Sequence, residues 1–168
     1  MSILTVPERL TQMLVDCHPS IVAAYHYTQG AIDRVERPCW LVFIEDATFP
    51  QIGNDQELVE QNYSIAYIGE IWNSPDNVYS IEYEIQAREV AVAVIKYFFE
   101  HKQLQMSNVR GIFPSELPSL NGVTMMNIGN RSGISLFSRD AVAGQAFWGF
   151  TFDVTITEQL MYDPVGLP

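Results

Sequence analysis

Residues Phe147–Thr157, which read FWGFTFDVTIT, decide the fold. Every second position holds a large apolar side chain: Trp148, Phe150, Phe152, Val154 and Ile156. The positions between them hold small or polar residues: Gly149, Thr151, Asp153, Thr155 and Thr157. Because successive side chains of a strand point to opposite faces, this alternation predicts a half-buried β-strand. Its apolar face must be covered by another apolar surface.

Residues 80–103 provide the best cover in the sequence. Their polar positions recur at helical spacings of three, four or seven: Glu82, Gln86, Glu89, Lys96, Glu100 and Gln103. The spacing predicts an amphipathic helix, with Ser80 as its N-cap and a wide apolar side. Two neighbouring apolar rows form that side, one of Ile85, Val92, Ile95 and Phe99 and one of Ala91, Val94 and Phe98. We expect this side of the helix to pack on the strand.

The remaining segments predict shorter elements. Residues 6–17 are expected to be a helix, and residues 39–44 a strand that is buried on both faces. A second strand is expected at 62–72, and short strands at 123–128 and 134–137 joined by a turn at 129–133. Residues 21–27 fit either a helix or a strand. The element order predicts an α+β fold, with a largely antiparallel or mixed sheet of about four to six strands against one long and one shorter helix.

Segments rich in glycine, proline or acids are expected between or after these elements. Residues 45–61 predict an exposed acidic loop, 107–122 an irregular connector, and 158–168 an extended C-terminal tail. With 168 residues, of which 48% are apolar and 17% charged, the whole chain is expected to form a single domain. The start of the chain lacks a secretory pattern, and the apolar run 90–99 is too short to span a bilayer. We therefore expect a protein of the cytoplasm with no membrane contact.

Negative charge restricts the possible partners. The net charge is −11, and nine acids but no lysine or arginine lie between Pro38 and Ala87. Binding to the outside of DNA requires basic residues that replace counterions on phosphates, so this charge disfavours it. The charge fits either solubility by self-repulsion or a surface past which DNA slides without sticking. The candidate acids for such a surface, or for an interface, are Asp55, Glu57, Glu60 and Asp153.

Sequence motifs for catalysis, metals and cofactors are weak. The three histidines lack the spacing of a metal pair, and the two cysteines form no CxxC motif. Cys17 and His18 are adjacent on a predicted helix, where their side chains diverge by about 100°. The turn at Gly129–Gly133 places serine fourth, not third as a GxSxG nucleophile requires. Asp153 could bind a cation, but no second carboxylate is tied to it by spacing. We expect no catalytic residues, metal or cofactor.

The layout resembles that of the tail-terminator, or tail completion, proteins of long-tailed bacteriophages. An N-terminal helix leads to a strand opened by proline (Arg37–Ile44), then to a long loop and a second strand (Tyr63–Trp72). The long helix follows, and the chain closes with the alternating strand at Trp148–Thr157. The similarity covers roughly residues 3–158 and consists of element order, size and acidity.

The resemblance implies a homo-oligomeric ring, usually a hexamer. The ring would cap the head-proximal end of the tail tube in the virion, stop tube polymerisation and dock to the head–tail connector protein. DNA would pass through the lumen without specific binding. Candidate interface residues are Phe113, Pro114 and Pro118 in the connector and Met161 and Tyr162 in the tail. Alternatives are another neck or connector protein, or a small ligand-binding or enzymatic α+β domain.

Overall fold

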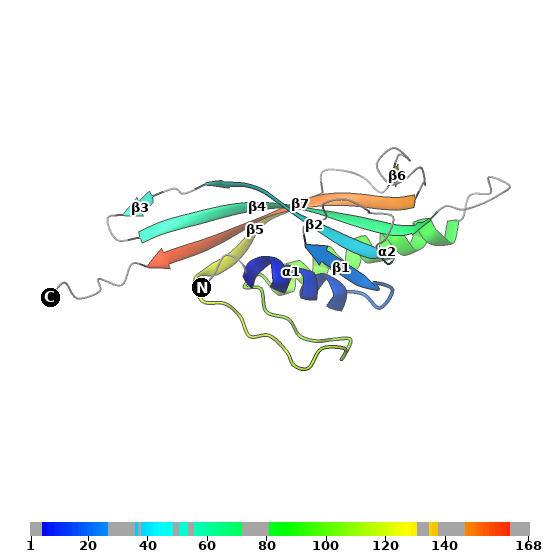
Figure 1. Cartoon of the computed structure of the whole chain (residues 1–168), viewed down its shortest axis with the longest axis horizontal. Helices are drawn as coiled ribbons and strands as arrows, with labels where there is room; N and C mark the ends of the chain where they lie inside the picture. Colours follow the sequence, from blue (N-terminus) through cyan, green and yellow to red (C-terminus); the bar gives the residue numbers. More distant parts are fainter. Residues whose placement is uncertain are drawn as a thin grey trace.

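A computed structural model of the chain describes residues 5–26, 36, 38–48, 51–53, 56–71, 81–130, 135–137 and 147–161. Two helices, α1 (Thr5–Asp16) and α2 (Ile81–Glu100), lie on one face of a mixed β-sheet (Figure 1). The strands are β1 (Ala23–His26), β2 (Cys39–Thr48), β3 (Gln51–Gly53), β4 (Gln56–Ile71), β5 (Val123–Asn130), β6 (Ser135–Phe137) and β7 (Phe147–Met161). The α+β prediction, with a mixed sheet against helices, is confirmed.

The strands across the sheet follow the order β1-β2-β4-β7-β5, with β3 beside β4 and β6 beside β7. β1 runs parallel to β2, and the other pairs are antiparallel. The segment at 21–27, which the sequence left open, therefore contains a strand. The longest pairing joins β4 to β7, from Gln56 opposite Met161 to Ile71 opposite Phe147. The alternating strand of the sequence analysis thus lies inside the sheet and not at its edge.

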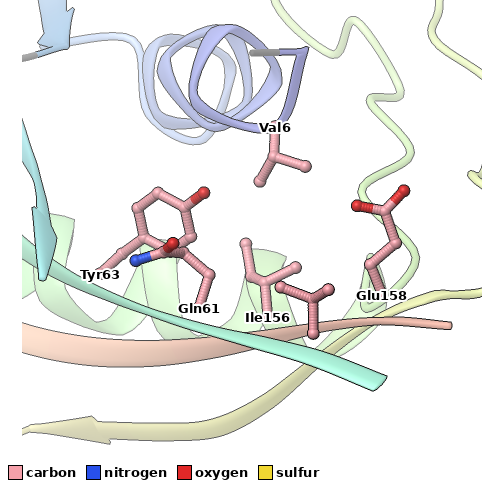
Figure 2. A pocket seen from close by; sticks show the side chains of 6 residues that line it. Val6, Gln61, Tyr63, Ile156 and Glu158 are labelled. Carbon is pink, nitrogen blue, oxygen red and sulfur yellow. The ribbon is translucent and has the colours of Figure 1, made fainter. Parts of the chain in front are cut away.

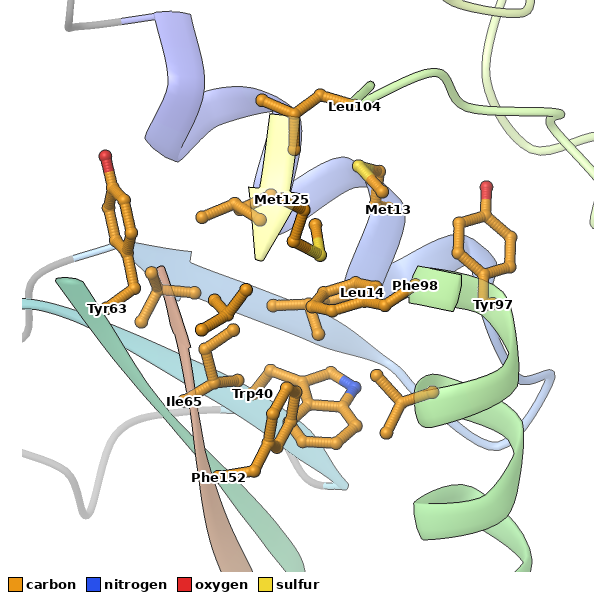
Figure 3. Packing of buried hydrophobic residues seen from close by; sticks show 14 of the residues in the cluster. Met13, Leu14, Trp40, Tyr63, Ile65, Tyr97, Phe98, Leu104, Met125 and Phe152 are labelled. Atoms are coloured by element: carbon orange, nitrogen blue, oxygen red, sulfur yellow. The ribbon is translucent and has the colours of Figure 1, made fainter. Parts of the chain in front are cut away.

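The apolar face of β7 forms the centre of the core (Figure 3). Phe150, Phe152 and Val154 are each at most 1% exposed. Both phenylalanine rings meet the Trp40 ring edge-on, with centroids 5.5 and 5.9 Å away. The ring of Phe98, on α2, packs against that of Phe152 with the two centroids 5.7 Å apart. The predicted cover of this strand by the long helix is confirmed, and each such buried side chain contributes about 1.5–3 kcal/mol.

One apolar row of α2 faces this core, whereas of the other row only Ile95 packs against it. Val94 and Phe98 are fully buried, whereas Ile85, Val92 and Phe99 are 49%, 71% and 53% exposed. The expectation that the whole apolar side of the helix packs on the sheet is wrong. A helix on a sheet buries a stripe of limited width, and here that stripe is centred on the fully buried residues Ala87, Val90, Val94 and Phe98. The row Ile85–Val92–Phe99 lies on the opposite side of the helix.

The predicted acidic loop at 45–61 is mostly strand. β2 continues to Thr48, and β4 already begins at Gln56. The second strand was predicted to begin near residue 62, but it begins earlier, at Gln56. Acidic residues made this stretch look like a loop, but a sheet is held by backbone hydrogen bonds that any residue except proline can make. β4 finds those partners on β7, where Leu58 lies opposite Gln159 and Glu60 opposite Thr157.

Two further boundaries differ from the sequence prediction. β7 runs to Met161, so residues 158–161 of the predicted tail are strand, and residues 162–168 lie outside the described part of the chain. β5 and β6 do not pair with each other through a turn at 129–133. Both pair with the same edge of β7, β5 at residues 152–158 and β6 at residues 147–149. They follow one another along β7.

Figure 1 shows the sheet extending past the helices at one end. We call this extension the arm. It consists of β3, residues 56–58 of β4 and residues 159–161 of β7. Helix α1 reaches only as far as Val6, which packs near Val59 and Ile156. The arm therefore lies beyond the helix layer of its own chain.

Candidate functional site

A polar hollow lies on the sheet face opposite the helices. Its lining residues are Glu45, Asn62, Asn127, Gly129, Asp153 and Thr155. Asp153 and Thr155 belong to the polar side of β7, as the sequence predicted, and Asn62 faces them from β4. The Thr155 hydroxyl donates a 2.7 Å hydrogen bond to the side-chain oxygen of Asn62. This surface is polar and hydrogen-bonding, in contrast to the apolar face that the helices cover.

A β-bulge brings Glu45 into the same hollow. Residue pairing between β2 and β4 shifts between Ile44 and Ala47, and the carbonyl of Glu45 accepts a 2.9 Å bond from the Gln61 amide. Glu45 and Asp153 are 108 positions apart (153 − 45) and line one cavity. The sequence identified Asp153 but gave no second carboxylate, because strand pairing and not spacing brings Glu45 there.

The other predicted acids are spread along the sheet. Glu60 is partly buried on β4 opposite Thr157, and its carboxylate accepts a 3.4 Å bond from the Thr48 hydroxyl. The backbone of Glu57 pairs with Leu160 in the arm. Asp55 lies outside the described residues. Glu57 and Glu60 thus follow one strand toward the end of the sheet and do not converge with Asp153.

The predicted tail contacts are only partly described. Met161 pairs with Gln56 through its backbone as the last residue of β7. Tyr162 lies outside the described residues. The backbone position of Met161 places it in the arm.

The predicted connector is fastened to α1. We call residues 101–122, between α2 and β5, the strap; Figure 1 shows it below α1, on the side away from the sheet. Arg9 of α1 donates hydrogen bonds to the carbonyls of Leu104 and Pro118, one on each leg of the strap, at 3.2 and 2.5 Å. The legs bond each other through the backbones of Met106 and Leu117 at 2.9 and 3.0 Å. The strap is irregular, as predicted, but held in place.

Asp16 holds the far end of the strap. Its side chain is 1% exposed and accepts bonds from the backbone N–H groups of Val109 and Arg110, at 2.9 and 3.0 Å. The Tyr97 hydroxyl donates a third bond of 2.8 Å. Burial, and then the bond to Asp16, raise the pKa of Tyr97. The sequence analysis missed this cluster, because its members come from three distant segments and form no motif.

Arg110 completes the attachment. Its guanidinium donates to the carbonyls of Val15 and Ile21 at 2.8 and 2.7 Å, and to that of Pro19 at 3.2 Å. These three carbonyls lie at and just after the end of α1, where helical carbonyls lack partners within the helix. The strap therefore closes the C-terminal end of α1.

The predicted interface residues of the strap differ in exposure. Phe113 is partly buried and packs against the core, whereas Pro114 and Pro118 are exposed. Asn108 fixes Phe113 through two bonds of 2.9 and 3.1 Å between its amide and the Phe113 backbone. The expectation that Phe113 is an interface residue therefore loses part of its support, since its ring contacts its own chain.

Cys17 and His18 do not form a nucleophilic pair. The Cys17 thiol donates a 3.0 Å bond to the carbonyl of Leu14, and His18 Nδ1 lies 2.7 Å from the Ser20 hydroxyl. Burial, followed by the nearby Asp16, raises the pKa of Cys17 to about 12. The thiol is therefore protonated at neutral pH, and only the thiolate is a good nucleophile.

A small cavity lies between α1 and the sheet, at the end of the core near the arm (Figure 2). Tyr63, Gln61, Ile156 and Glu158 point from the sheet toward α1, where Val6 points back at them. Burial, with a smaller contribution from Glu158, raises the pKa of Tyr63 to about 12. The cavity measures about 10 Å³, which is the space of about one water molecule. It is too small for a substrate.

Among the described residues, no three His, Cys, Asp or Glu side chains gather closely enough to hold a metal ion. No helix in the described ranges is long and apolar enough to cross a bilayer.

Comparison of the sequence with models of known protein families and with curated proteins finds no match.

Proposed function

We propose that this protein is a tail-terminator subunit of a long-tailed bacteriophage or phage-like particle. Copies of it form a ring, usually of six, on the head-proximal end of the tail tube. The ring stops polymerisation of the tube protein and presents a docking surface for the head–tail connector. The site of action is the virion, after assembly in the host cytoplasm.

The arm is the observation that carries this proposal. Strands that extend past their own helix layer bury little apolar surface and are weakly stabilised in an isolated subunit. Such an extension gains stability when another molecule covers it. The arm contains the backbone of Glu57, and Asp55 and Glu60 lie within three residues of it in the sequence. A ring with these acids on its lumen would repel DNA phosphates and let the genome pass.

The free edges of the sheet also favour assembly between copies. β1 pairs with β2 only at residues 39–42, so no described strand pairs with the outer edge of Phe43–Thr48. Two of these residues, Glu45 and Asp46, are exposed acids, which oppose uncontrolled strand pairing. In a ring, each copy has a neighbouring copy on both sides, which can cover such an edge.

The first test uses particles that lack this protein. Electron microscopy should show overlong tails without heads, because nothing stops the tube from growing. Tails of normal length that lack heads would instead indicate a neck or connector protein. Normal, headed tails would overturn both assignments. Light scattering of the purified protein should show a ring or concentration-dependent association.

A second test examines the acids. Replacing Asp55, Glu57 and Glu60 together with lysine should slow or trap DNA during ejection, because phosphates would bind the lumen. A matched control replaces Glu82, which is exposed on α2, with lysine. Unchanged ejection in the triple variant would place these acids outside the lumen.

The polar hollow around Asp153 favours the other function class, a small ligand-binding domain. Glu45 and Asp153 offer carboxylates, and Asn62 offers an amide, in one cavity. Titration calorimetry with divalent cations and small polar cations tests this alternative. Binding that is lost in Asp153→Asn would support it, and absence of heat would favour the tail assignment.

A further inference from the structure

We propose that His18 is a pH-sensitive latch, whose protonation loosens the far end of the strap from α1. Residues 17–22 form the turn between α1 and β1. This turn contains His18 and also two of the carbonyls to which Arg110 of the strap donates, those of Pro19 and Ile21. The latch is independent of the proposed function, because it concerns the attachment of two segments within one chain.

One ring nitrogen of His18 is unprotonated in the closed turn. The backbone N–H of Ser20 donates a 3.2 Å hydrogen bond to His18 Nδ1, and the Ser20 hydroxyl lies 2.7 Å from the same atom. A backbone N–H can only donate, so Nδ1 has to accept with its lone pair. A proton on Nδ1 would face the Ser20 N–H and remove this bond. The hydroxyl could rotate and accept instead, but the amide could not.

The strap is attached to this same turn. The N–H of Ile21 donates a 3.2 Å bond to the carbonyl of His18, which closes the turn around Pro19 and Ser20. Arg110 donates to the carbonyls of Pro19 and Ile21 at 3.2 and 2.7 Å. A change that opens the turn at Ser20 therefore displaces two of the three carbonyls that accept bonds from Arg110.

The environment of the ring opposes its charged form. Burial lowers the pKa of His18 below its ordinary value of 6.5; among the nearby charges, Glu89 of α2 raises this pKa and Arg110 lowers it. Coupling between two charged groups is reciprocal, so a protonated His18 also disfavours Arg110 in its closed position. Burial therefore supplies most of the effect, and the strap contributes through Arg110.

The other titratable groups beside the turn have defined states or partners. Asp16, two positions before the ring, accepts bonds from Tyr97 and from two backbone N–H groups of the strap. Burial raises the pKa of Cys17 to about 12, so this thiol does not titrate in acid. Strand β1, which follows the turn, carries no charged residue before His26.

The direction of the pH effect follows from the lowered pKa. In an open turn His18 is solvated and has its ordinary pKa of 6.5. Between the lowered and the ordinary pKa, the closed form binds fewer protons than the open form. The contribution of His18 to closure is therefore fully present above the ordinary pKa and is lost as pH falls toward the lowered one. Acid opens the latch.

His101, at the start of the strap, provides a comparison within the chain. Its Nδ1 lies 2.7 Å from the carbonyl oxygen of Tyr97, and its Nε2 lies 2.5 Å from the hydroxyl of Ser107. A carbonyl accepts hydrogen bonds and a hydroxyl can accept them, so a ring that carries both protons keeps both bonds. Of these two histidines, only His18 loses a bond when it is protonated.

Amide hydrogen exchange of the full chain tests the latch. After correction for the intrinsic exchange rate, protection of the N–H groups of Ser20, Val109 and Arg110 should fall at least about twofold from about pH 7.5 to about pH 5.5. The amides of Val94 and Phe98, in the buried row of α2, should keep their protection. Equal losses at all five amides would indicate general destabilisation by acid and would overturn the latch, as would unchanged protection at Val109 and Arg110.

His18→Asn separates His18 from carboxylates that titrate in the same range. An asparagine side-chain oxygen accepts the backbone N–H two residues on, as Nδ1 of His18 does, but it takes up no proton near neutral pH. The pH dependence at Val109 and Arg110 should disappear in His18→Asn and persist in the matched control His101→Asn. Persistence in His18→Asn would assign the effect to another group and overturn the latch.

Titration of the natural protein makes the test independent of how the variants fold. Nuclear magnetic resonance of the His18 ring should give a midpoint below the ordinary 6.5, and the Ser20 amide shift should change with the same midpoint. A midpoint at or above 6.5 would contradict the latch. So would a Ser20 amide that does not follow the ring.

Discussion

The hydroxyl of Tyr97 donates a 2.8 Å hydrogen bond to Oδ2 of Asp16, across 81 positions of the chain. This bond joins the C-terminal ends of α2 and α1. The same carboxylate accepts two backbone N–H groups of the strap, at Val109 and Arg110. A carboxylate at a helix C-terminus is electrostatically unfavourable, so these three donors must compensate for its position and its burial.

Tyr97→Phe should therefore lower the free energy of unfolding by about 1.5–3 kcal/mol, the usual value of a hydrogen bond to a charged group. Asp16→Ala should cost at least about twice as much, because three donors, one of them buried, lose their acceptor. Urea unfolding measures both changes. Tyr83→Phe on the same helix is the control, since the described residues offer its hydroxyl no hydrogen bond. Equal losses in Tyr97→Phe and Tyr83→Phe would contradict the role given to Asp16.

Stability should fall in alkaline solution. Burial raises the pKa of Cys17 from 9.0 to about 12 and that of Tyr63 from 10.0 to about 12. Between the unfolded and folded values the unfolded chain binds fewer protons, so the free energy of unfolding decreases as pH rises. The stability that these two groups contribute is fully present below pH 9. Above pH 9 it decreases through Cys17, and above pH 10 it decreases through Tyr63 as well. Urea unfolding at pH 8 to 11 measures it.

A matched substitution checks this order of titration. Cys17→Ala should remove the earliest part of the alkaline decrease and leave the part above pH 10. Absorbance of tyrosinate should show that Tyr63 and Tyr97 ionise later than the exposed tyrosines. A decrease that begins at the same pH in the variant and the natural protein would contradict the assignment to Cys17.

Two valines of α2 should differ sharply in their effect on stability. Val94 is 0% exposed and Val92 is 71% exposed. Val94→Ala removes buried methyl groups and leaves a cavity, so we expect a loss of about 2–3 kcal/mol. Val92→Ala should change stability by no more than about 0.5 kcal/mol, because the site is exposed and alanine favours helix. Thermal unfolding of dilute protein compares them. Similar losses would mean that the buried side of α2 has been assigned wrongly.

Gly122 should resist substitution. Its φ is +74°, and a Cβ there would lie 3.3 Å from the Gln159 carbonyl oxygen. Gly122→Ala should lower the free energy of unfolding by about 1–2 kcal/mol, because residues with a Cβ are strained at a positive φ of this size. Gly129→Ala is the control, since its Cβ would make only an ordinary contact of 3.7 Å. A neutral Gly122→Ala would indicate that the end of the strap adapts freely.

The elements that could be predicted from the sequence are those in which a periodic pattern of apolar and polar residues is long. The alternation in β7 and the helical period of α2 each extend over several turns or pairs, so burial enforces one conformation. The four-residue strand β1 has no such repeat, and its assignment depends on pairing with β2. The acids of β2 and β4 were misleading, because their polarity suggested a loop, whereas these strands are held by backbone pairing with each other and, for β4, with β7.

The candidate sites were less predictable than the fold. Asp153 was found because it interrupts a row of threonines, but its neighbour Glu45 is brought there by a bulge. The attachment of the strap to Asp16 was missed, because a buried carboxylate has no local signature until its donors are in place. Val92 and Ile85 were expected in the core, because the sequence shows how wide an apolar side is but not how much of it the sheet covers.

The sequence by itself determined that β7 and α2 form and which side of β7 is buried, since both follow from the spacing of neighbouring side chains. Only the tertiary structure decided which apolar row of α2 faces the sheet, that the acidic stretch continues as strand, and that the strap closes over α1. These outcomes depend on contacts between segments far apart in the chain. No local period encodes such contacts, because their free energy exists only once the sheet has brought the partners together.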